Sequence, residues 1–315
     1  MVSGGAGFIG SHVADAHLRR GDEVVILDDL SSGKRKNVPA GAEFVELDLR
    51  APEAANLLRT GRFDLLSHHA AQKDVRVSVA DPRRDAAVNV DGLLNLLEGA
   101  REGGVQRVVF VSSGGVVYGE PELRPTPETA AKLPESPYGV TKLAGEQYLY
   151  YYHRVHGMEY VALRYSNVFG PRQDPSGEAG VVAIFCNRLL RGEPITVYGT
   201  GEQTRDYVLV SDVVAANLLA ADADLPPART LDDRAFNVGT GSETSVLELA
   251  EALMVASGER VELRHAPARA GELLHSSLDV SRLRSLGWST KGTLGEGLAE
   301  TFRWIAADTS AERVS

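Results

Sequence analysis

The apolar residues in the first half of the chain form short continuous runs, separated by longer stretches with helical spacing. Runs of this length are typical of strands buried in a parallel sheet, and they cover residues 23–27, 43–47, 63–68 and 107–112. In intervening stretches such as 11–20 and 88–101, apolar positions recur every three or four residues, which predicts helices. This alternation predicts an α/β protein with a doubly wound parallel sheet and right-handed crossovers.

The pattern changes after Tyr165. Segments rich in Pro and Gly, 170–177 and 225–233, are expected to be loops, and the elements around them are shorter and mixed. We therefore expect residues 1–165 to form one α/β domain and residues 166–315 to form mainly a smaller mixed α/β lobe. Segments around 206–222 and 234–240 are expected to return to the first domain.

Four glycines fall within the first ten residues: Gly4, Gly5, Gly7 and Gly10. They fit two related patterns, G-x-G-x-x-G from Gly5 and G-x-x-G-x-x-G from Gly4. Such a turn lets backbone N–H groups approach a pyrophosphate at the N-terminus of the following helix, as in Rossmann folds. Only residues 1–3 precede the turn, so we expect either a very short first strand or a natural start further upstream. A turn that only packs a helix on a strand is the less favoured interpretation.

Acidic residues stand at the end of the strand that follows this turn. Asp28 and Asp29 lie there, and Asp28 is 24 residues after Gly4. A carboxylate at this spacing suits the 2′-hydroxyl of an adenosine ribose and repels a 2′-phosphate, so the predicted cofactor is NAD rather than NADP. Other polar or small residues also follow predicted strands, where sites of α/β sheets lie; they are Asp48, 69–71 and 112–113.

A second motif lies at the start of a predicted helix that runs toward Gly157. Ser136 is a good N-cap, and Pro137 suits the first helical position. Tyr138 and Lys142 are four residues apart, so they share one face of the helix. A free tyrosine has a pKa of about 10, and a nearby ammonium together with a positive nicotinamide ring would lower that pKa. The pair is therefore a candidate for acid–base catalysis.

Composition narrows the classes of partner. The 315 residues include 33 basic and 43 acidic side chains, and a net charge of −10 argues against broad binding to nucleic acid or anionic membranes. We expect no signal peptide, and the sequence contains no apolar run of about 20 residues. The single cysteine, Cys186, lies in an apolar run, so we expect a buried thiol and a reducing, cytoplasmic location. The eight histidines show no metal-binding spacing.

Taken together, these motifs resemble the extended short-chain dehydrogenase/reductase family, and most closely its UDP-glucose 4-epimerase branch. The resemblance runs nearly end to end, and it is carried by residues 4–10, 28–35, 69–72, 118–119, 138–142, 163–167, 205–207 and 269–272. It implies an NAD-dependent epimerisation at C4 of a UDP-hexose through a transient 4-keto sugar. It also implies a homodimer that pairs the helix after Tyr138 with the helix over 88–101.

The resemblance assigns roles to individual residues. The residues that it implies for NAD are Gly4, Gly7, Phe8 and Ile9 at the pyrophosphate, Asp28 and Asp29 at the ribose, Asp48 and Leu49 at the adenine, Ala70, Ala71, Gln72 and Asn89 along the cofactor, and Tyr138, Lys142 and Tyr165 near the nicotinamide. Those that it implies for the UDP-sugar are Lys73, Ser113, Tyr138, Asn167, Thr196, Tyr198, Arg205, Arg269, Glu272 and Ser276. Of these, Arg205 and Arg269 are the cations that a diphosphate needs.

One position departs from the family pattern. The family usually places a Ser or Thr hydroxyl five residues before the glycine of its V-Y-G motif, and here that residue is Gly114. Ser113 or Ser112 is then the candidate for the third catalytic group. The Asp-Glu pair of the related 4,6-dehydratases is absent as well, which favours simple epimerisation. Ser276 is small at a position that gates the sugar C2 substituent in the family, so we expect N-acetylated sugars to fit.

Two alternatives remain open at this point. The first is another UDP-sugar enzyme on the same scaffold, such as a UDP-glucuronate epimerase or decarboxylase, although no unambiguous site for a C6 carboxylate is visible. The second is a non-catalytic NAD-binding regulator, which would not need the Tyr138–Lys142 pair.

Overall fold

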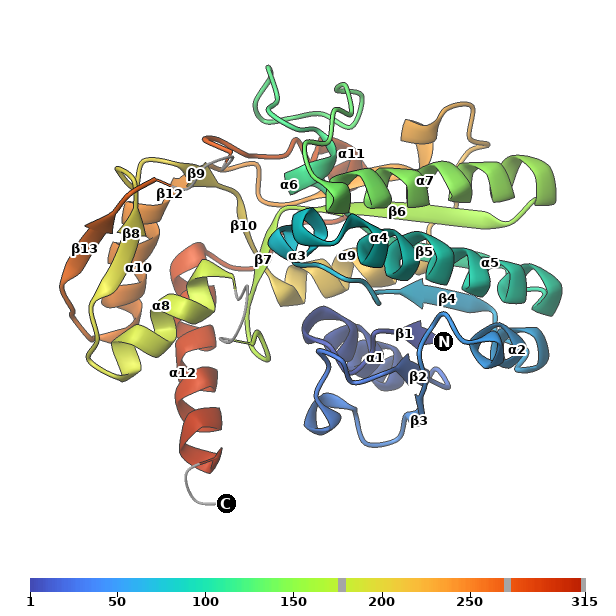
Figure 1. The fold of residues 1–315 in the computed structure, drawn as a ribbon, viewed down its shortest axis with the longest axis horizontal. Helices are drawn as coiled ribbons and strands as arrows, with labels where there is room; N and C mark the ends of the chain where they lie inside the picture. The colour runs from blue at the N-terminus through green and yellow to red at the C-terminus, as the bar shows by residue number, and fades with distance from the viewer. Residues whose placement is uncertain (175–179, 269–272, 313–315) are drawn as a thin grey trace.

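The computed structural model, drawn in Figure 1, describes residues 1–174, 180–268 and 273–312. Its centre is a parallel sheet of seven strands in the order β11-β6-β5-β4-β1-β2-β3. The strands are β1 (Val2–Ser3), β2 (Val25–Asp28), β3 (Glu43–Glu46), β4 (Leu65–His68), β5 (Arg107–Ser113), β6 (Glu159–Tyr165) and β11 (Ala235–Val238). The four strands expected from the apolar runs are confirmed to within two residues at each end. The predicted α/β, doubly wound fold is therefore confirmed.

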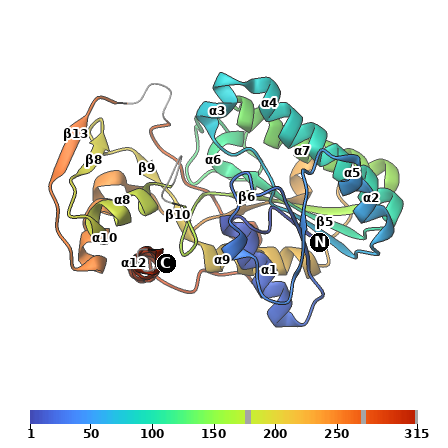
Figure 2. The same ribbon diagram turned by 60° about the horizontal axis from the view of Figure 1, so that its bottom comes forward.

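Helices cover both faces of this sheet (Figure 2). One layer contains α2 (Pro52–Thr60), α5 (Gly92–Gly103) and α7 (Pro137–His156), and the other contains α1 (Phe8–Arg20) and α9 (Val210–Asp222). The apolar faces of the first layer meet the sheet in a core that includes Leu96, Leu97 and Phe110. On the second face, Val213 and Ala216 of α9 pack with strand residues such as Val109.

The stretch before α5 is one nearly continuous helical segment. It starts with α3 (Val75–Ala80) and α4 (Pro82–Ala86), continues through a π-helical turn, η2 (Ala87–Asp91), and then becomes α5. The helix expected over 88–101 is thus longer and begins earlier. Asp81 explains the earlier start, because its side chain accepts the N–H of Arg84 and caps α4 immediately before Pro82.

The second half of the chain contributes to both parts of the molecule. Its α9 and β11 belong to the large sheet and its layers, whereas most other elements form a smaller lobe beside the sheet (Figure 1). The described residues of the lobe form three two-stranded pairings: β7 (Asn167–Phe169) with β10 (Tyr207–Leu209), β8 (Ile195–Tyr198) with β13 (Leu263–Ala266), and β9 (Thr204–Arg205) with β12 (Thr244–Ser245). Its helices are α8 (Val181–Leu190), α10 (Val246–Ser257) and α12 (Leu294–Glu312).

Short elements complete the chain: η1 (Arg35–Asn37), α6 (Gly114–Val117), η3 (Leu231–Arg234) and α11 (Ser281–Ser285). The core of the lobe includes Cys186 on α8, which is fully buried, and burial raises the pKa of its thiol to about 12. The expected buried cysteine is confirmed. Among the described residues, no helix has both the length and the apolar character that a membrane crossing requires.

Candidate active site

The glycine-rich turn joins β1 to α1 at the carboxyl edge of the sheet. Gly4 has φ +71°, and a Cβ there would lie 2.5 Å from the backbone nitrogen of Ala70. A Cβ at Gly10 would overlap the carbonyl oxygen of Gly4, so α1 can begin this close to the turn only without a side chain. Gly7 is the N-cap of α1 and offers no side-chain cap, which leaves first-turn N–H groups for an anion. The turn therefore fits the pyrophosphate of a dinucleotide.

Asp28 ends β2 directly beside this turn. Asp28 is 8% exposed, and its carboxylate accepts the backbone N–H groups of Ala6 at 3.0 Å and Leu30 at 2.9 Å. Burial raises the pKa of this carboxyl group. Each oxygen retains a second lone pair for a hydroxyl donor, which suits a ribose. Asp29, by contrast, is exposed and accepts from the backbone and hydroxyl of Ser31.

The residues expected near the adenine follow β3. Asp48 forms an ion pair with Arg50, which holds the pKa of the carboxyl group below its usual value. Leu49 is buried, and a Cβ at Gly92 of α5 would overlap its side chain. Leu49 therefore packs under α5, and Asp48 lies at the surface beside it.

The segment after β4, residues 69–72, forms a wall next to the glycine-rich turn. Ala70 contacts Gly4 through its backbone, and Gln72 is fixed to Asn89 of the π-helical turn η2. The Gln72 N–H donates to Asn89 Oδ1 at 2.8 Å, and Asn89 Nδ2 donates to the Gln72 carbonyl at 2.9 Å. Such turns are frequent at functional sites, and this one carries Asn89 to the wall.

Tyr138 and Lys142 lie on the first turns of α7, as expected. The Ser136 hydroxyl accepts the Gly139 N–H at 3.1 Å, which confirms the predicted N-cap. Lys142 is 3% exposed, and its Nζ donates to the Val111 carbonyl at 3.0 Å. The same Nζ lies 5.7 Å from the centroid of the Tyr138 ring. The geometry places an ammonium beside a half-buried phenol at the end of β5.

Burial dominates the electrostatics of this pair. Desolvation lowers the pKa of Lys142 to about 8, although the carboxylates of Asp85 and Glu146 oppose this shift. Desolvation, followed by the negative charge of Asp85, raises the pKa of Tyr138 above its usual value. The side chains of this protein thus raise the tyrosine pKa on their own, and the expected lowering requires the added positive charge of a nicotinamide ring.

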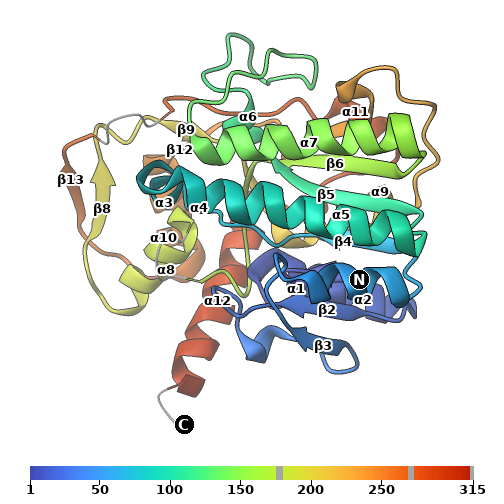
Figure 3. The same ribbon diagram turned by 45° about the vertical axis from the view of Figure 1, so that its right-hand side comes forward.

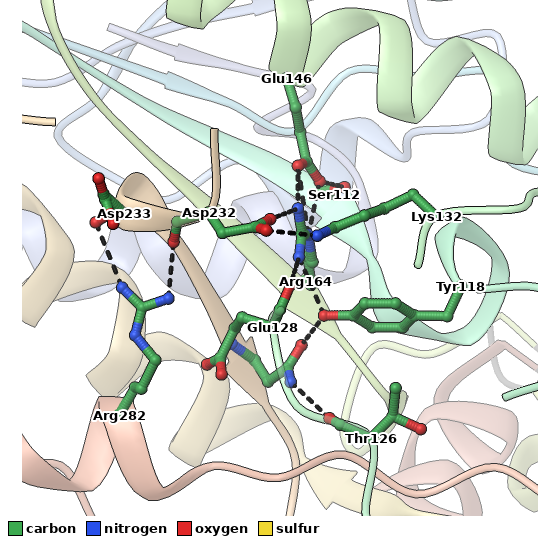
Figure 4. A network of polar contacts seen from close by, with 11 residues as sticks. Ser112, Tyr118, Thr126, Glu128, Lys132, Glu146, Arg164, Asp232, Asp233 and Arg282 are labelled. Atoms are coloured by element: carbon green, nitrogen blue, oxygen red, sulfur yellow. Dashed lines mark hydrogen bonds and ion pairs between the residues drawn. The ribbon is translucent and has the colours of Figure 1, made fainter. Parts of the chain in front are cut away.

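The two candidate serines at the end of β5 have different surroundings. The Ser112 hydroxyl donates to Glu146 Oε1 in the network that Figure 4 shows, and both residues are buried. In this network Glu146 and Arg164 form an ion pair with 2.6 Å between Oε2 and Nη2. Side chains alternate along a strand, so Ser113 lies on the opposite side of β5 from Ser112. Its hydroxyl makes no hydrogen bond within the described part of the chain, and Ser113 is the one that can serve a ligand.

The structure also explains the glycine at position 114. A Cβ at Gly114 would lie 2.5 Å from Cδ1 of Leu278, a buried residue of the segment between β13 and α11. A Ser or Thr at this position would therefore require Leu278 to move. Leu278 occupies the space that the Cβ of such a residue would enter.

The residues expected to hold the UDP-sugar come from separate segments. Lys73, which follows the wall, and Asn167, at the start of β7, are both exposed. Thr196 and Tyr198 lie on β8. Arg205 lies on β9, and its Nη1 donates to the Thr204 carbonyl. A bridge between Thr204 and His275 brings the 6%-exposed Ser276 next to β9. Tyr165, at the end of β6, is buried and accepts from Asn217 at 2.6 Å. Arg269 and Glu272 lie outside the described residues.

Sequence reasoning missed one buried group, Asp85 of α4. Its carboxylate is fully buried and accepts hydrogen bonds from Gln72, Asn89 and Thr141. Asp85 stands four residues before Asn89, and this helical spacing is the only signal for it in the sequence.

A parallel sheet with a glycine turn at one strand end and a Tyr-x-x-x-Lys pair at another defines an enzyme of the short-chain dehydrogenase/reductase class. The sequence profile of the NAD dependent epimerase/dehydratase family matches residues 1–239, and the chain belongs to this family. The family and the NAD cofactor that the sequence predicts are thereby confirmed.

Individual relatives match over nearly the whole chain. The chain is 45% identical over 311 residues to a UDP-glucose 4-epimerase of Mycolicibacterium smegmatis, covering 97% of each. The structure of a UDP-glucose 4-epimerase of Thermotoga maritima with UDP-glucose is 44% identical, covers 98% of each chain and has a TM-score of 0.93. The corresponding structure from Thermus thermophilus with NAD is 45% identical, covers 96% of this chain and 97% of its own, and has a TM-score of 0.90.

Proposed function

We propose that this chain interconverts UDP-glucose and UDP-galactose by NAD-dependent epimerisation at C4 through a transient 4-keto sugar. The observation that carries the proposal is the Tyr138–Lys142 pair on α7, at the same sheet edge as the glycine turn. The nearly full-length similarity to UDP-glucose 4-epimerases supports it.

Tyr138 acts as the base. In its anionic form the phenol accepts the proton of the 4-hydroxyl as the C4–H bond breaks, and it returns this proton when the bond re-forms. When bound, NAD supplies the acceptor and donor of the C4 hydride. The ammonium of Lys142 favours the anionic form of Tyr138, against the desolvation that raises its pKa. The Ser113 hydroxyl donates a hydrogen bond to the oxygen on C4 as charge develops there.

Inversion requires the 4-keto sugar to present its other face while the nucleotide stays held. We assign this holding to the smaller lobe and the wall, through Lys73, Asn167, Thr196, Tyr198 and Arg205, together with Arg269 and Glu272. Arg205 lies within the described residues, and its guanidinium group suits the diphosphate. A single anchor distant from C4 leaves the sugar free to turn within the site.

The decisive experiment incubates the purified protein with UDP-glucose, UDP-GlcNAc and UDP-glucuronate, without added NAD, and identifies the products by NMR. We expect UDP-galactose from UDP-glucose, and a loss of several orders of magnitude in kcat for Tyr138→Phe with bound NAD unchanged. Tyr148→Phe, an exposed tyrosine on the same helix, is the matched control and should retain activity. Near-normal turnover by Tyr138→Phe would refute the assignment of Tyr138 as the base. Turnover of UDP-glucuronate alone would favour the alternative UDP-sugar enzymes, and NAD binding without any turnover would favour a regulator.

The small Ser276 supports a broader substrate range. Because its side chain is buried beside β9 and adds little volume, we expect UDP-GlcNAc to be converted as well. Ser276→Tyr should lower the ratio of UDP-GlcNAc to UDP-glucose turnover, and an unchanged ratio would exclude this role.

We also propose a homodimer that pairs α7 and α5 of two copies. The outer face of α7 exposes four large apolar or aromatic side chains, which are Val140, Tyr148, Tyr151 and Val155. Light scattering should give the mass of a dimer, and Tyr151→Glu should shift the protein toward the monomer. A monomeric wild-type protein would contradict the proposal.

A further inference from the structure

Asp85 is a buried carboxylate to which the mechanism above gives no task. It is fully buried on α4 and accepts three hydrogen bonds, all from neutral donors. Gln72 Nε2 donates at 2.8 Å, Thr141 Oγ1 at 2.8 Å and Asn89 Nδ2 at 3.1 Å. The three donors are two side-chain amides and one hydroxyl, and none of them carries a charge.

The three donors come from the segments that surround the proposed site. Gln72 belongs to the wall after β4, Asn89 to the π-helical turn, and Thr141 to α7, where it immediately precedes Lys142. The start of α7 is held to the same region a second time, because the Tyr138 N–H donates to Ser78 Oγ of α3 at 3.2 Å. Asp85 thus ties the wall to the helix that carries the acid–base pair.

No described Lys, Arg or His side chain forms an ion pair with Asp85. The cation that its charge acts on is Lys142, whose protonated form it favours, and it disfavours the anionic form of Tyr138. Glu146, the other carboxylate that acts on Lys142, is already paired with Arg164.

The remaining titratable and charged groups near the start of α7 do not compensate Asp85. His68 of β4 and the adjacent His69 are neutral, since burial lowers the pKa of each to about 3. The charged side chains of the flanking helices lie at the surface; they are Arg76 of α3, Arg83 and Arg84 of α4, and Asp91 of η2. Asp232 and Asp233 of η3 pair with Arg164, Lys132 and the N–H groups of residues 229 and 230. Asp85 is therefore the uncompensated charge on this side of Lys142.

We propose that Asp85 is a positioning residue of the acid–base pair: through Thr141, the residue before Lys142, it fixes the first turns of α7 against the wall after β4. This inference rests on the proposed function, in which Tyr138 is the base. The carboxylate of Asp85 also favours the protonated form of Lys142, and this effect of charge is separable from the positioning by hydrogen bonds.

The variant Asp85→Asn removes the charge and keeps the size of the side chain. Without the carboxylate, Lys142 loses its proton more readily and Tyr138 ionises more readily, so both groups titrate at lower pH. We expect both limbs of the kcat–pH profile to move to lower pH by about one unit, with KM for UDP-glucose changed less than twofold. The matched control is Asp212→Asn on α9, another buried carboxylate, which accepts the Lys291 N–H at 3.0 Å and lies in the opposite layer. It should leave the profile in place. A loss of activity at an unchanged profile in Asp85→Asn would overturn the charge role.

A second pair of variants tests the geometric part and also covers a failure of Asp85→Asn to fold. Thr141→Ser keeps the donor to Asp85, and Thr141→Val removes it. We expect Thr141→Ser to retain kcat and Thr141→Val to lose about tenfold or more at unchanged KM, consistent with a misplaced pair. Equal activities in the two variants would overturn the positioning role.

A titration without turnover distinguishes this inference from the proposed function. The absorbance of tyrosinate is followed against pH in the NAD-loaded protein, and the same curve of Tyr138→Phe is subtracted to isolate Tyr138. Asp85→Asn should lower the midpoint of this difference curve. An unchanged midpoint would overturn the effect of the Asp85 charge even if the enzyme is an epimerase, and a shifted midpoint would support this effect even if another residue proves to be the base.

Discussion

Helix α7 carries its reactive residues between two fully buried carboxylates that have opposite surroundings. Glu146, two turns after Tyr138, accepts from the guanidinium of Arg164 at 2.6 Å and from the Ser112 hydroxyl. Asp85, on the other side, accepts only from neutral side chains. The two groups are chemically alike, and their partners decide what each does for the site.

The network around Glu146 is compensated and extends away from the site. Arg164 also donates to Asp232 at 3.1 Å and to the hydroxyl of Tyr118 at 3.0 Å (Figure 4). It therefore joins β6, η3 and the segment after β5 to α7, and Figure 3 shows α7 lying along β6 at this place. This network fixes the end of β5 to α7, and Glu146, like Asp85, favours the protonated form of Lys142. The difference is the partner: Glu146 is paired with a guanidinium, whereas Asp85 accepts only from neutral side chains.

Glu146→Gln removes the carboxylate that pairs with Arg164 and should have the largest effect on stability. The change leaves the buried Arg164 without its carboxylate, and removing one partner of a buried pair costs about 3–5 kcal/mol. Because Asp232 still contacts Arg164, we expect the lower end, about 3 kcal/mol, as the loss in the free energy of unfolding measured in urea. The exposed Glu135→Gln is the control and should change stability by less than about 0.5 kcal/mol. A loss as small as that of the control would show that the network is not a structural joint.

Substitutions of the two serines at the end of β5 test the same distinction, because Ser112 belongs to the Glu146 network and Ser113 does not. Ser113→Ala should lower kcat about 100-fold, since it removes a hydroxyl that acts on the reacting oxygen, and leave the melting temperature unchanged. Ser112→Ala should do the reverse, with kcat within a few-fold and a loss of about 1.5 kcal/mol of stability, because it removes a buried hydrogen bond to a carboxylate. Steady-state kinetics and thermal denaturation of both variants suffice. A large kcat loss in Ser112→Ala alone would transfer the catalytic role to Ser112.

The sequence predicted the parts of the site that depend on local pattern. Apolar runs located the strands, so Asp28 and the serines 112–113 could be placed at strand ends, and helical spacing put Tyr138 and Lys142 on one face. The glycine spacing predicted the phosphate turn for the same reason. These features depend on residues close in sequence, where periodicity and backbone geometry determine the structure.

The remaining features depend on contacts between distant segments. Asp85 meets Gln72 and Thr141 only because three helices and a wall pack together, and no motif marks it. The choice between Ser112 and Ser113 depends on which side of β5 faces Glu146, which a single-residue change of register would reverse. The space available at Gly114 depends on Leu278, a residue more than 160 positions later in the chain, between β13 and α11.

Substitution at position 114 is expected to have the smallest effect on stability. It tests whether Leu278 keeps a hydroxyl from this position. Gly114→Ser forces a side chain against Leu278 and should cost about 1–2 kcal/mol by overpacking. Leu278→Ala alone leaves a cavity in the core, but in the double variant the serine fills part of that space. The two losses should therefore be less than additive in a double-mutant cycle. If the hydroxyl at 114 also reaches the reacting oxygen, Ser113→Ala/Gly114→Ser/Leu278→Ala should recover part of the kcat that Ser113→Ala loses. Additive stabilities with no recovery would mean that Leu278 is not what keeps a hydroxyl from this position.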